Sequence, residues 1–310
     1  MTEASTIAVS AETGAAPGEA GDAPRSLASD AWRSLKKNPI FWVSVILIAL
    51  FVLMAAWPSL FTHTDPNAAV LKDARVPPNA NAWFGRDIQG YDIYSRTIYG
   101  ARASILVGVF TTIATVIIGG VLGVAAGFYG GWLDAILSRV TDIFFAIPLL
   151  LGGILFMSVF ANDANTPYFV VVGKVVLVLA VFGWPTIARL MRSSVMQVKP
   201  NDYVQAARAL GASPWRIIRS HVLPNALAPV IVISTINLGV FIAAEAALSF
   251  LGIGLTPPAV SWGVSISDAL IALRTTPHIL FFPSLFLSLA VLAFIMLGDA
   301  VRDAFDPKSR

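Results

Sequence analysis

The sequence contains few charged residues and no cysteine. Asp, Glu, Lys and Arg make up 13% of the 310 residues, against roughly 25% in an average soluble domain. The absence of cysteine excludes disulfide bonds and thiolate metal sites, and His63, His221 and His278 are too scattered to predict a metal cluster. A net charge of +3 is too small to indicate nucleic-acid binding. Because 56% of the residues are hydrophobic, the composition indicates an integral membrane protein.

Two signatures of enzymes are also absent. The chain has no G-x-x-x-x-G-K-[ST] stretch, so it lacks the P-loop that binds nucleotide phosphates. No nucleophile, base and orienting acid form a recognisable triad. We therefore expect no catalytic residue, no metal site and no cofactor in this chain, and any energy from nucleotide hydrolysis must come from a partner protein.

Long hydrophobic runs are the main feature of the sequence. A bilayer core about 30 Å thick requires about 20 mostly apolar residues in each helix that crosses it. Six runs meet this requirement, at 40–61, 103–128, 141–160, 168–187, 228–251 and 280–297. The sequence therefore predicts an all-α polytopic membrane protein with six transmembrane helices.

Glycine and proline have informative positions within these runs. Gly119, Gly123 and Gly127 follow each other at intervals of four, a spacing that places small residues on one helix face and predicts close helix packing. Pro148 and Pro185 lie in the third and fourth runs. Proline removes a backbone hydrogen bond, so both positions predict bends.

The distribution of basic residues predicts the orientation. Lys36 and Lys37 precede the first run, and the loop 188–227 has several Lys and Arg residues against Asp202 alone. Cytoplasmic loops carry an excess of such residues. We therefore place both termini and this loop in the cytoplasm and expect a multi-pass protein of the cytoplasmic (inner) membrane.

Composition divides the chain into four parts. Residues 1–38 are predicted to be a disordered cytoplasmic tail, because most of them are small or polar and show no helical stripe. Residues 39–102 contain the first transmembrane helix and an extracytoplasmic segment that ends in an interfacial helix rich in tyrosine. A five-helix core follows over 103–300, and 301–310 form a cytoplasmic C-terminal tail.

The stretch NDYVQAARALGASPWRIIRSHVLPN, at 201–225, predicts two short helices inside the basic loop. Asn201 or Asp202 can cap the first helix, and Gln205 has the spacing of a capping box relative to Asp202. Gly211 supplies the left-handed residue that ends this helix. The first helix should therefore have two defined ends outside the bilayer.

The second helix of the pair is predicted to begin at Ser213 and Pro214, since Ser is a preferred N-cap and Pro is tolerated at the first helical position. It should end before Pro224. Alanines allow close approach to the first helix, and Trp215 gives the second an apolar anchor. We interpret the pair as a docking element. The alternative is an amphipathic loop that lies on anionic lipid headgroups.

The same stretch resembles a known family. Gln205-Ala206-Ala207, then Gly211, then HVLP at 221–224 resemble the cytoplasmic EAA loop of permease subunits of binding-protein-dependent ABC importers, which is the coupling helix that docks on the ATPase subunit. The resemblance to the C-type permease of dipeptide, oligopeptide and nickel importers extends over most of the chain after about residue 80. It rests on the stretches YVQAARALGAS, HVLPNALAPVIV, EAALSFLGIGLTPPAVSWG, LGDAVRDAFDP, SRTIYGARASILVG and VTDIFFAIPLLL.

The resemblance implies a function and a set of partners. The chain would move short peptides across the membrane together with a second homologous permease subunit, one or two ATP-binding subunits and an extracytoplasmic substrate-binding protein. ATP and Mg would bind to the partner subunits, so this chain would not itself be an enzyme. Importers of nickel, glutathione and oligosaccharides share these motifs. The residues implied to couple the chain to the ATPase are Asp202, Gln205, Ala206, Ala207, Arg208, Gly211, Trp215, Arg216, Arg219 and Pro224.

Some positions depart from the family pattern. Gln205 stands where the family has Glu, so an ion pair with a base on the ATPase cannot form there. In FGRDIQGYD, at 84–92, Arg86 and Tyr91 replace the usual Thr and Arg. The literal EAA at 245–247 lies inside the fifth run, and it is not the coupling motif.

Lys174 and Glu245 are the ionisable residues deepest in the apolar runs. A charge at the middle of a lone span costs about 2.5–3.5 kcal/mol on insertion scales, so each should face protein or water. One interpretation places both on the translocation path, or in the proton relay of a secondary transporter driven by an ion gradient. In the other, Lys174 reaches the outer surface and Glu245 is hydrogen-bonded near a helix end.

Overall fold

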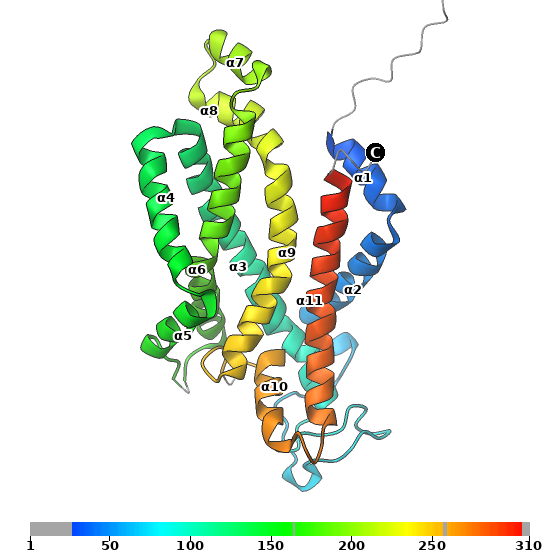
Figure 1. The fold of residues 1–310 in the computed structure, drawn as a ribbon. Helices are drawn as coiled ribbons and strands as arrows, with labels where there is room; N and C mark the ends of the chain where they lie inside the picture. The colour runs from blue at the N-terminus through cyan, green and yellow to red at the C-terminus, as the bar shows by residue number, and fades with distance from the viewer. Residues whose placement is uncertain (1–26, 164, 257–258, 306–310) are drawn as a thin grey trace, which may run out of the picture.

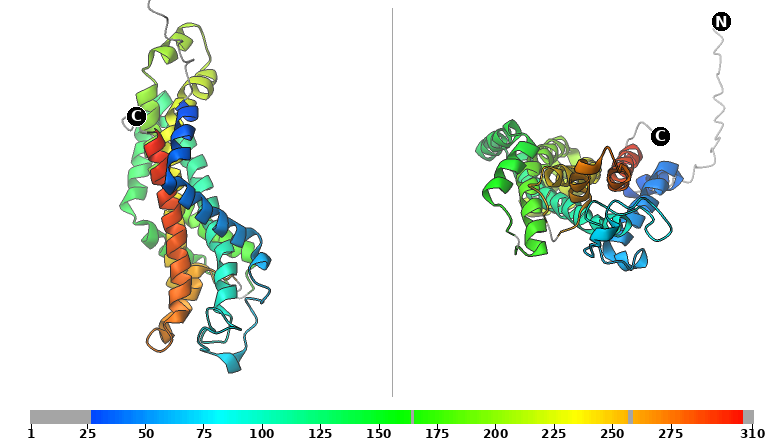
Figure 2. Two further views of the ribbon diagram at one scale, coloured as in Figure 1. Left: turned by 90° about the vertical axis from the view of Figure 1, so that its right-hand side faces the viewer. Right: turned by 90° about the horizontal axis from the view of Figure 1, so that it is seen from below.

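In the computed structural model, which describes residues 27–163, 165–256 and 259–305, the chain is a bundle of long helices (Figures 1 and 2). Those long and apolar enough to cross a bilayer are α2 (Pro39–Ala56), α3 (Ile93–Tyr129), α6 (Tyr168–Val198), α9 (Leu223–Phe250) and α11 (His278–Phe305). No strand occurs among the described residues. The prediction of an all-α polytopic membrane protein is confirmed.

The third predicted span is a broken helix. α4 (Gly131–Ala146) and α5 (Leu149–Val159) meet at an angle of 82°. Pro148 causes the break, because its ring keeps Ile147 in an extended conformation and it has no N–H to continue the helix. The bend predicted at this proline is confirmed, and the count of six spans holds if the bent pair is one span. Pro185 lies inside α6, which continues past it without a break.

Two long helices extend well beyond the predicted spans. α3 begins at Ile93, where Asp92 caps it by accepting a hydrogen bond from the Ser95 N–H at 2.7 Å. The helix predicted at the end of the extracytoplasmic segment is therefore present, but it is the start of α3 and continuous with the second span. α6 continues to Val198, so the first part of the predicted loop 188–227 is helix.

The predicted tail 1–38 contains a helix. α1 (Leu27–Lys37) packs Ala31 and Leu35 against Ala300 and Ala304 near the end of α11. The expectation of disorder was therefore wrong for these residues, while residues 1–26 lie outside the described part of the chain. Most residues of the short α1 are polar, and its apolar residues lie on one narrow side, so its pattern gave little indication of a packed helix.

The bundle has two distinct ends (Figure 1). At one end lie α1, the end of α11, and the helices α7 (Asp202–Ala209) and α8 (Pro214–Ile217). At the other lie α10 (Trp262–Ala269) and the irregular segment between α2 and α3. We call these the inner and the outer end, after the predicted orientation. The remaining short helices are η1 (Pro58–Leu60), η2 (Leu71–Asp73), η3 (Ile218–Val222) and η4 (Leu270–Ala272).

Close packing of α3 against α6 organises the inner half. A Cβ atom at Gly123 would lie 2.5 Å from the carbonyl oxygen of Ala188, and one at Gly119 would lie 2.6 Å from that of Trp184. Both distances are shorter than any real contact of a Cβ atom, so only glycine fits. The predicted close packing of these glycines is confirmed. It fixes the helix that leads into α7.

Candidate functional site

The inner tip, residues 202–222, is held by a cluster of buried aliphatic side chains. Val204 of α7 is fully buried and packs with Ile217, Ile218 and Val222 of the second helix. The same cluster includes Ile187, Met191 and Val195 of α6. Because the cluster joins α6, α7 and the start of α9, the inner tip is built to move as one body with these two long helices.

The turn inside the inner tip has the predicted geometry. Gly211 adopts a φ of 79°, in the left-handed region that favours glycine. Ser213 caps α8 by accepting a hydrogen bond from the Arg216 N–H at 3.4 Å, and Pro214 occupies the start of the helix. These three predictions are confirmed.

The predicted capping box is absent. Asn201 is the N-cap of α7, and its side chain makes no capping bond. The Gln205 amide instead donates to the carbonyl oxygen of Lys199 at 2.9 Å. That carbonyl lies just after the end of α6, where backbone acceptors have no partner inside the helix. Gln205 therefore joins α7 to the end of α6.

The sequence predicted that the second helix ends before Pro224, but the helix continues past this residue. α8 passes through the π-helical turn η3 directly into α9, and Pro224 lies in the first turn of α9. A π turn is wider than an α turn, and we ascribe the tolerance of proline, which lacks an N–H, to this local change of register. The second helix is thus a direct extension of α9.

The exposed surface of the inner tip combines apolar and basic side chains. Leu210 is 88% exposed and Trp215 is 69% exposed, although both are large and apolar. Arg208, Arg216 and Arg219 are also exposed and form no ion pair within the described residues. Of the other predicted coupling residues, one is half-buried, Ala207. The exposed ones are Asp202, Gln205, Ala206, Gly211 and Pro224. Exposed aromatic and basic side chains on a rigid support are typical of protein docking surfaces.

Two ion pairs connect α6 to the broken helix. Arg192 forms a bidentate pair with Asp134, with Nη2 to Oδ2 at 2.7 Å, and Arg189 Nη2 lies 3.1 Å from Asp142 Oδ1. The Arg189 guanidinium also lies over the Phe145 ring, 4.1 Å from its centre. Both arginines were predicted to lie in the loop, because the fourth apolar run ends at residue 187. Their ion pairs were not predicted, because pairing between distant helices leaves no local pattern. A movement of α6 would therefore be transmitted to α4.

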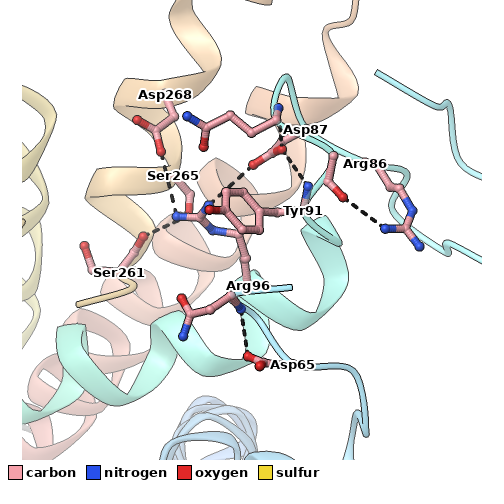
Figure 3. A network of polar contacts seen from close by, with 11 residues as sticks. Asp65, Arg86, Asp87, Tyr91, Arg96, Ser261, Ser265 and Asp268 are labelled. Atoms are coloured by element: carbon pink, nitrogen blue, oxygen red, sulfur yellow. Dashed lines mark hydrogen bonds and ion pairs between the residues drawn. The ribbon is translucent and has the colours of Figure 1, made fainter. Parts of the chain in front are cut away.

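At the outer end, Arg96 is the centre of a polar network (Figure 3). Its guanidinium lies 3.5 Å from Asp87, 3.8 Å from Asp268 and 4.5 Å from the centre of the Tyr91 ring. The Arg96 side chain is only 11% exposed. The network connects α3, the irregular segment and α10, and no pattern in the sequence predicted it.

The departures from the family pattern belong to this network or lie next to it. Asp87 accepts hydrogen bonds from the N–H groups of Tyr91 and Gln89, both at 2.9 Å, so the tight loop presents the Tyr91 ring to Arg96. Arg86 donates to the Gly90 carbonyl at 3.0 Å. Burial raises the pKa of Asp268, an effect that Arg96 partly opposes.

The two charged residues of the apolar runs make separate contacts. Lys174 donates to the carbonyl oxygens of Phe160 and Ala161, at 3.2 and 3.1 Å, beyond the end of α5. Glu245 is fully buried and accepts hydrogen bonds from Ser104 at 2.8 Å and Ser249 at 2.7 Å. Neither lines a described cavity. Their role in a translocation path stays a prediction.

Comparison with known families agrees with this architecture. The family described as binding-protein-dependent transport system inner membrane component matches residues 119–310. The chain belongs to this family. The N-terminal TM domain of oligopeptide transport permease C matches residues 26–78 of this permease.

Relatives of the permease are similar over nearly the whole chain. The dipeptide transport system permease protein DppC of Bacillus subtilis is 39% identical over 92% of this chain and 87% of its own length. The oligopeptide transport system permease protein OppC of the same organism is 38% identical over 95% and 96%. The glutathione transport system permease protein GsiD of Pectobacterium atrosepticum is 34% identical over 89% and 90%.

Solved structures share the fold of the permease. A chain of the MetNI methionine ABC transporter superposes with a TM-score of 0.54 at 21% identity, over 67% of this chain and 96% of the other. A chain of an amino acid ABC transporter gives a TM-score of 0.50 at 17% identity, over 66% and 91%. At these identities the likeness concerns the fold alone.

Proposed function

We propose that this permease carries short peptides into the cytoplasm, with energy from ATP hydrolysed by partner subunits. It pairs with a second homologous permease and receives substrate from an extracytoplasmic binding protein. The inner tip faces the cytoplasm, and ATP and Mg bind only to the partners. The similarity to dipeptide and oligopeptide permeases over almost the whole chain supports this substrate class.

The inner tip is the observation that carries the proposal. Its surface exposes Leu210 and Trp215, while its underside packs into α6 and α9. A partner that binds this surface and moves can therefore displace α6 and α9 together. Such a lever converts closure of an ATPase dimer into a change between outward-open and inward-open packings of the helices. Gln205 contributes no charge to this docking, and its bond to Lys199 supports the lever from within.

The contacts of Lys174 and Glu245 weigh against a secondary transporter. Both side chains are satisfied by carbonyl or hydroxyl groups of the permease itself. The two classes differ in a simple assay: an ion-driven transporter takes up substrate as a lone chain in liposomes under a proton gradient, whereas the proposed permease does not.

The coupling role is tested in the reconstituted complex by Trp215→Ala and Arg208→Glu. We expect each to reduce substrate-stimulated ATP hydrolysis and binding of the ATPase at least tenfold, because docking residues of this kind contribute 2 kcal/mol or more, roughly. Arg33→Glu is the control, since this exposed arginine lies on α1 at the same end of the bundle. Undiminished stimulation in both tip variants would refute the coupling role.

A further inference from the structure

The two helices that carry the inner tip, α6 and α9, touch each other at Gly183 and Phe241. A Cβ atom at Gly183 would lie 2.8 Å from the Phe241 ring, so only glycine leaves room for this ring. Phe241 is 3% exposed and belongs to a cluster of buried apolar side chains in the outer half of the bundle, together with Leu179 and Leu248. The contact between Phe241 and Gly183 is therefore the inner boundary of a tightly packed apolar region.

Two polar residues lie directly inward of this contact. α6 runs towards the inner end, and Thr186 follows Gly183 by three residues. α9 runs in the opposite direction, and Asn237 precedes Phe241 by four residues. Residues three or four apart share one face of a helix, with their Cβ atoms about 5–6 Å apart. Thr186 and Asn237 are therefore at the same depth, each one turn inward of the same contact.

The side chains of Thr186 and Asn237 have unused hydrogen-bonding groups. Thr186 is exposed, Asn237 is half-buried with an accessible amide, and neither forms a hydrogen bond with the described residues. Other hydroxyls of the spans differ. Ser44, Thr112 and Thr235 donate to the carbonyl oxygen four residues earlier in their own helices, at 2.7, 2.8 and 2.9 Å. A polar group without a partner is unfavourable in hydrocarbon, so Thr186 and Asn237 are poorly suited to face lipid.

The far side of α3 shows what a lipid-facing surface of this chain looks like. α6 and α9 lie in front of α3 in Figure 1. α3 packs against Ile187 of α6 through Gly119, and residues two positions away from Gly119 point about 200° away from it. These residues, Ile117 and Val121, are 59% and 64% exposed. Every exposed residue of α3 between Arg102 and Tyr129 is apolar: Phe110, Ile113, Ile117, Ile118 and Val121. At the same depth, only the α6–α9 side exposes polar groups without partners.

The chemistry of the two residues indicates their ligand. A hydroxyl and a carboxamide each donate and accept hydrogen bonds, and neither is charged. Such groups can bond to the N–H and C=O groups of a peptide backbone, whatever side chains the peptide carries. Arg189, one turn further inward on α6, is already paired with Asp142 at 3.1 Å. The site is therefore suited to neutral amide groups and not to a charged ligand.

We propose that Thr186 and Asn237 line the substrate path and form hydrogen bonds with the backbone of a passing peptide. The proposal rests on peptide import as the function. The second permease subunit would close the other side of the path. Because the inner tip displaces α6 and α9 together, movement of the ATPase would act directly on the two helices that contact the substrate.

The first test is labelling in lipid nanodiscs that contain the whole complex. The chain has no cysteine, so a single introduced thiol is the only one in this subunit. We expect Thr186→Cys and Asn237→Cys to react with a charged methanethiosulfonate reagent at least about tenfold faster than Val121→Cys, because the reactive thiolate forms only in contact with water. Mass spectrometry of this chain measures the labelling. Val121 is the control, since it is exposed at a similar depth on the far side of α3.

The second test is trialanine uptake into proteoliposomes with ATP and loaded binding protein. Thr186→Val and Asn237→Leu should each lower the rate about two- to tenfold, the effect of losing one or two neutral hydrogen bonds. Binding of the ATPase should not change, because the inner tip is intact. Thr235→Val is the matched control, since this hydroxyl is already bonded within α9 and its loss should leave uptake unchanged. Size-exclusion chromatography checks that each variant complex is assembled.

Two results would overturn the proposal. One is that both introduced thiols react as slowly as the one at position 121, which would mean a dry surface packed by protein or lipid. The other is that Thr186→Val and Asn237→Leu both import trialanine at the rate of Thr235→Val. Failure of peptide import itself is recognised separately, because the wild-type complex would then take up no trialanine whatever the labelling shows.

Discussion

The two ends of the bundle use their charged residues in opposite ways. At the inner tip, Arg208, Arg216 and Arg219 are exposed and have no partner among the described residues, while aliphatic side chains hold the element together. At the outer end, Arg96 is nearly buried between Asp87 and Asp268 and itself holds the segments together. The first arrangement leaves charge available to another protein, and the second consumes it in the fold.

This difference follows from local structure. The inner tip consists of helices whose backbone groups are largely satisfied, so apolar packing is enough to position them. The outer segment is mostly irregular, and its loops need hydrogen bonds and ion pairs to fix their path. We expect charge substitutions to affect stability at the outer end and partner binding at the inner end.

The largest effect should come from Gly123→Val, which disrupts the close packing of α3 against α6 that supports the inner tip. The new side chain would begin 2.5 Å from the Ala188 carbonyl oxygen, so α3 and α6 must separate. Overpacking usually costs about 1–3 kcal/mol, and a rigid backbone neighbour puts this site at or above the upper limit. We expect little assembled complex by size-exclusion chromatography.

Gly173→Val is the matched control for this substitution. Gly173 also lies within a long helix, but a Cβ atom there would meet nothing within 4 Å. Both variants carry the same cost of a β-branched residue in a helix. Equal yields of the two complexes would contradict the proposed role of the close packing between α3 and α6.

An intermediate effect should follow Arg96→Gln at the outer end. The substitution leaves Asp87 and Asp268 facing each other without a cation, and breaking a buried pair typically costs about 3–5 kcal/mol. Because Asp268 is partly exposed, we expect about 3 kcal/mol or less, measured as a loss of thermal stability. Arg208→Gln at the inner tip should leave thermal stability unchanged, and equal losses would contradict the proposed difference between the ends.

The smallest effect concerns pH at the outer end. Burial raises the pKa of Asp268 above its ordinary value of 3.8, so the folded protein binds the proton of this carboxyl group more tightly than the unfolded chain does. The stability contributed by the protonated carboxyl group is complete below pH 3.8 and is lost as the pH rises through the raised pKa. Asp268→Asn should therefore flatten the fall of thermal stability over this window. Identical pH profiles of the variant and wild type would contradict the assignment.

Local patterns accounted for the features that depend on neighbouring residues. The turn at Gly211, the cap at Ser213 and the break at Pro148 were all predictable, because backbone conformation at these residues is set by their own side chains and their immediate neighbours. The capping box at Gln205 failed for the opposite reason. Its amide found the Lys199 carbonyl, an acceptor whose position depends on how α6 and α7 meet.

The sequence by itself determined that the chain crosses a membrane and carries an ordered basic element between two spans, because apolar length and helix-end signals are local properties. Only the tertiary structure decided which arginines are available. Arg192 and Arg96 pair with carboxylates distant in the chain, Arg208 has no partner in the described residues, and Arg102 faces a cavity. Charge pairing depends on distances across the fold, and these are set by the packing of the helices.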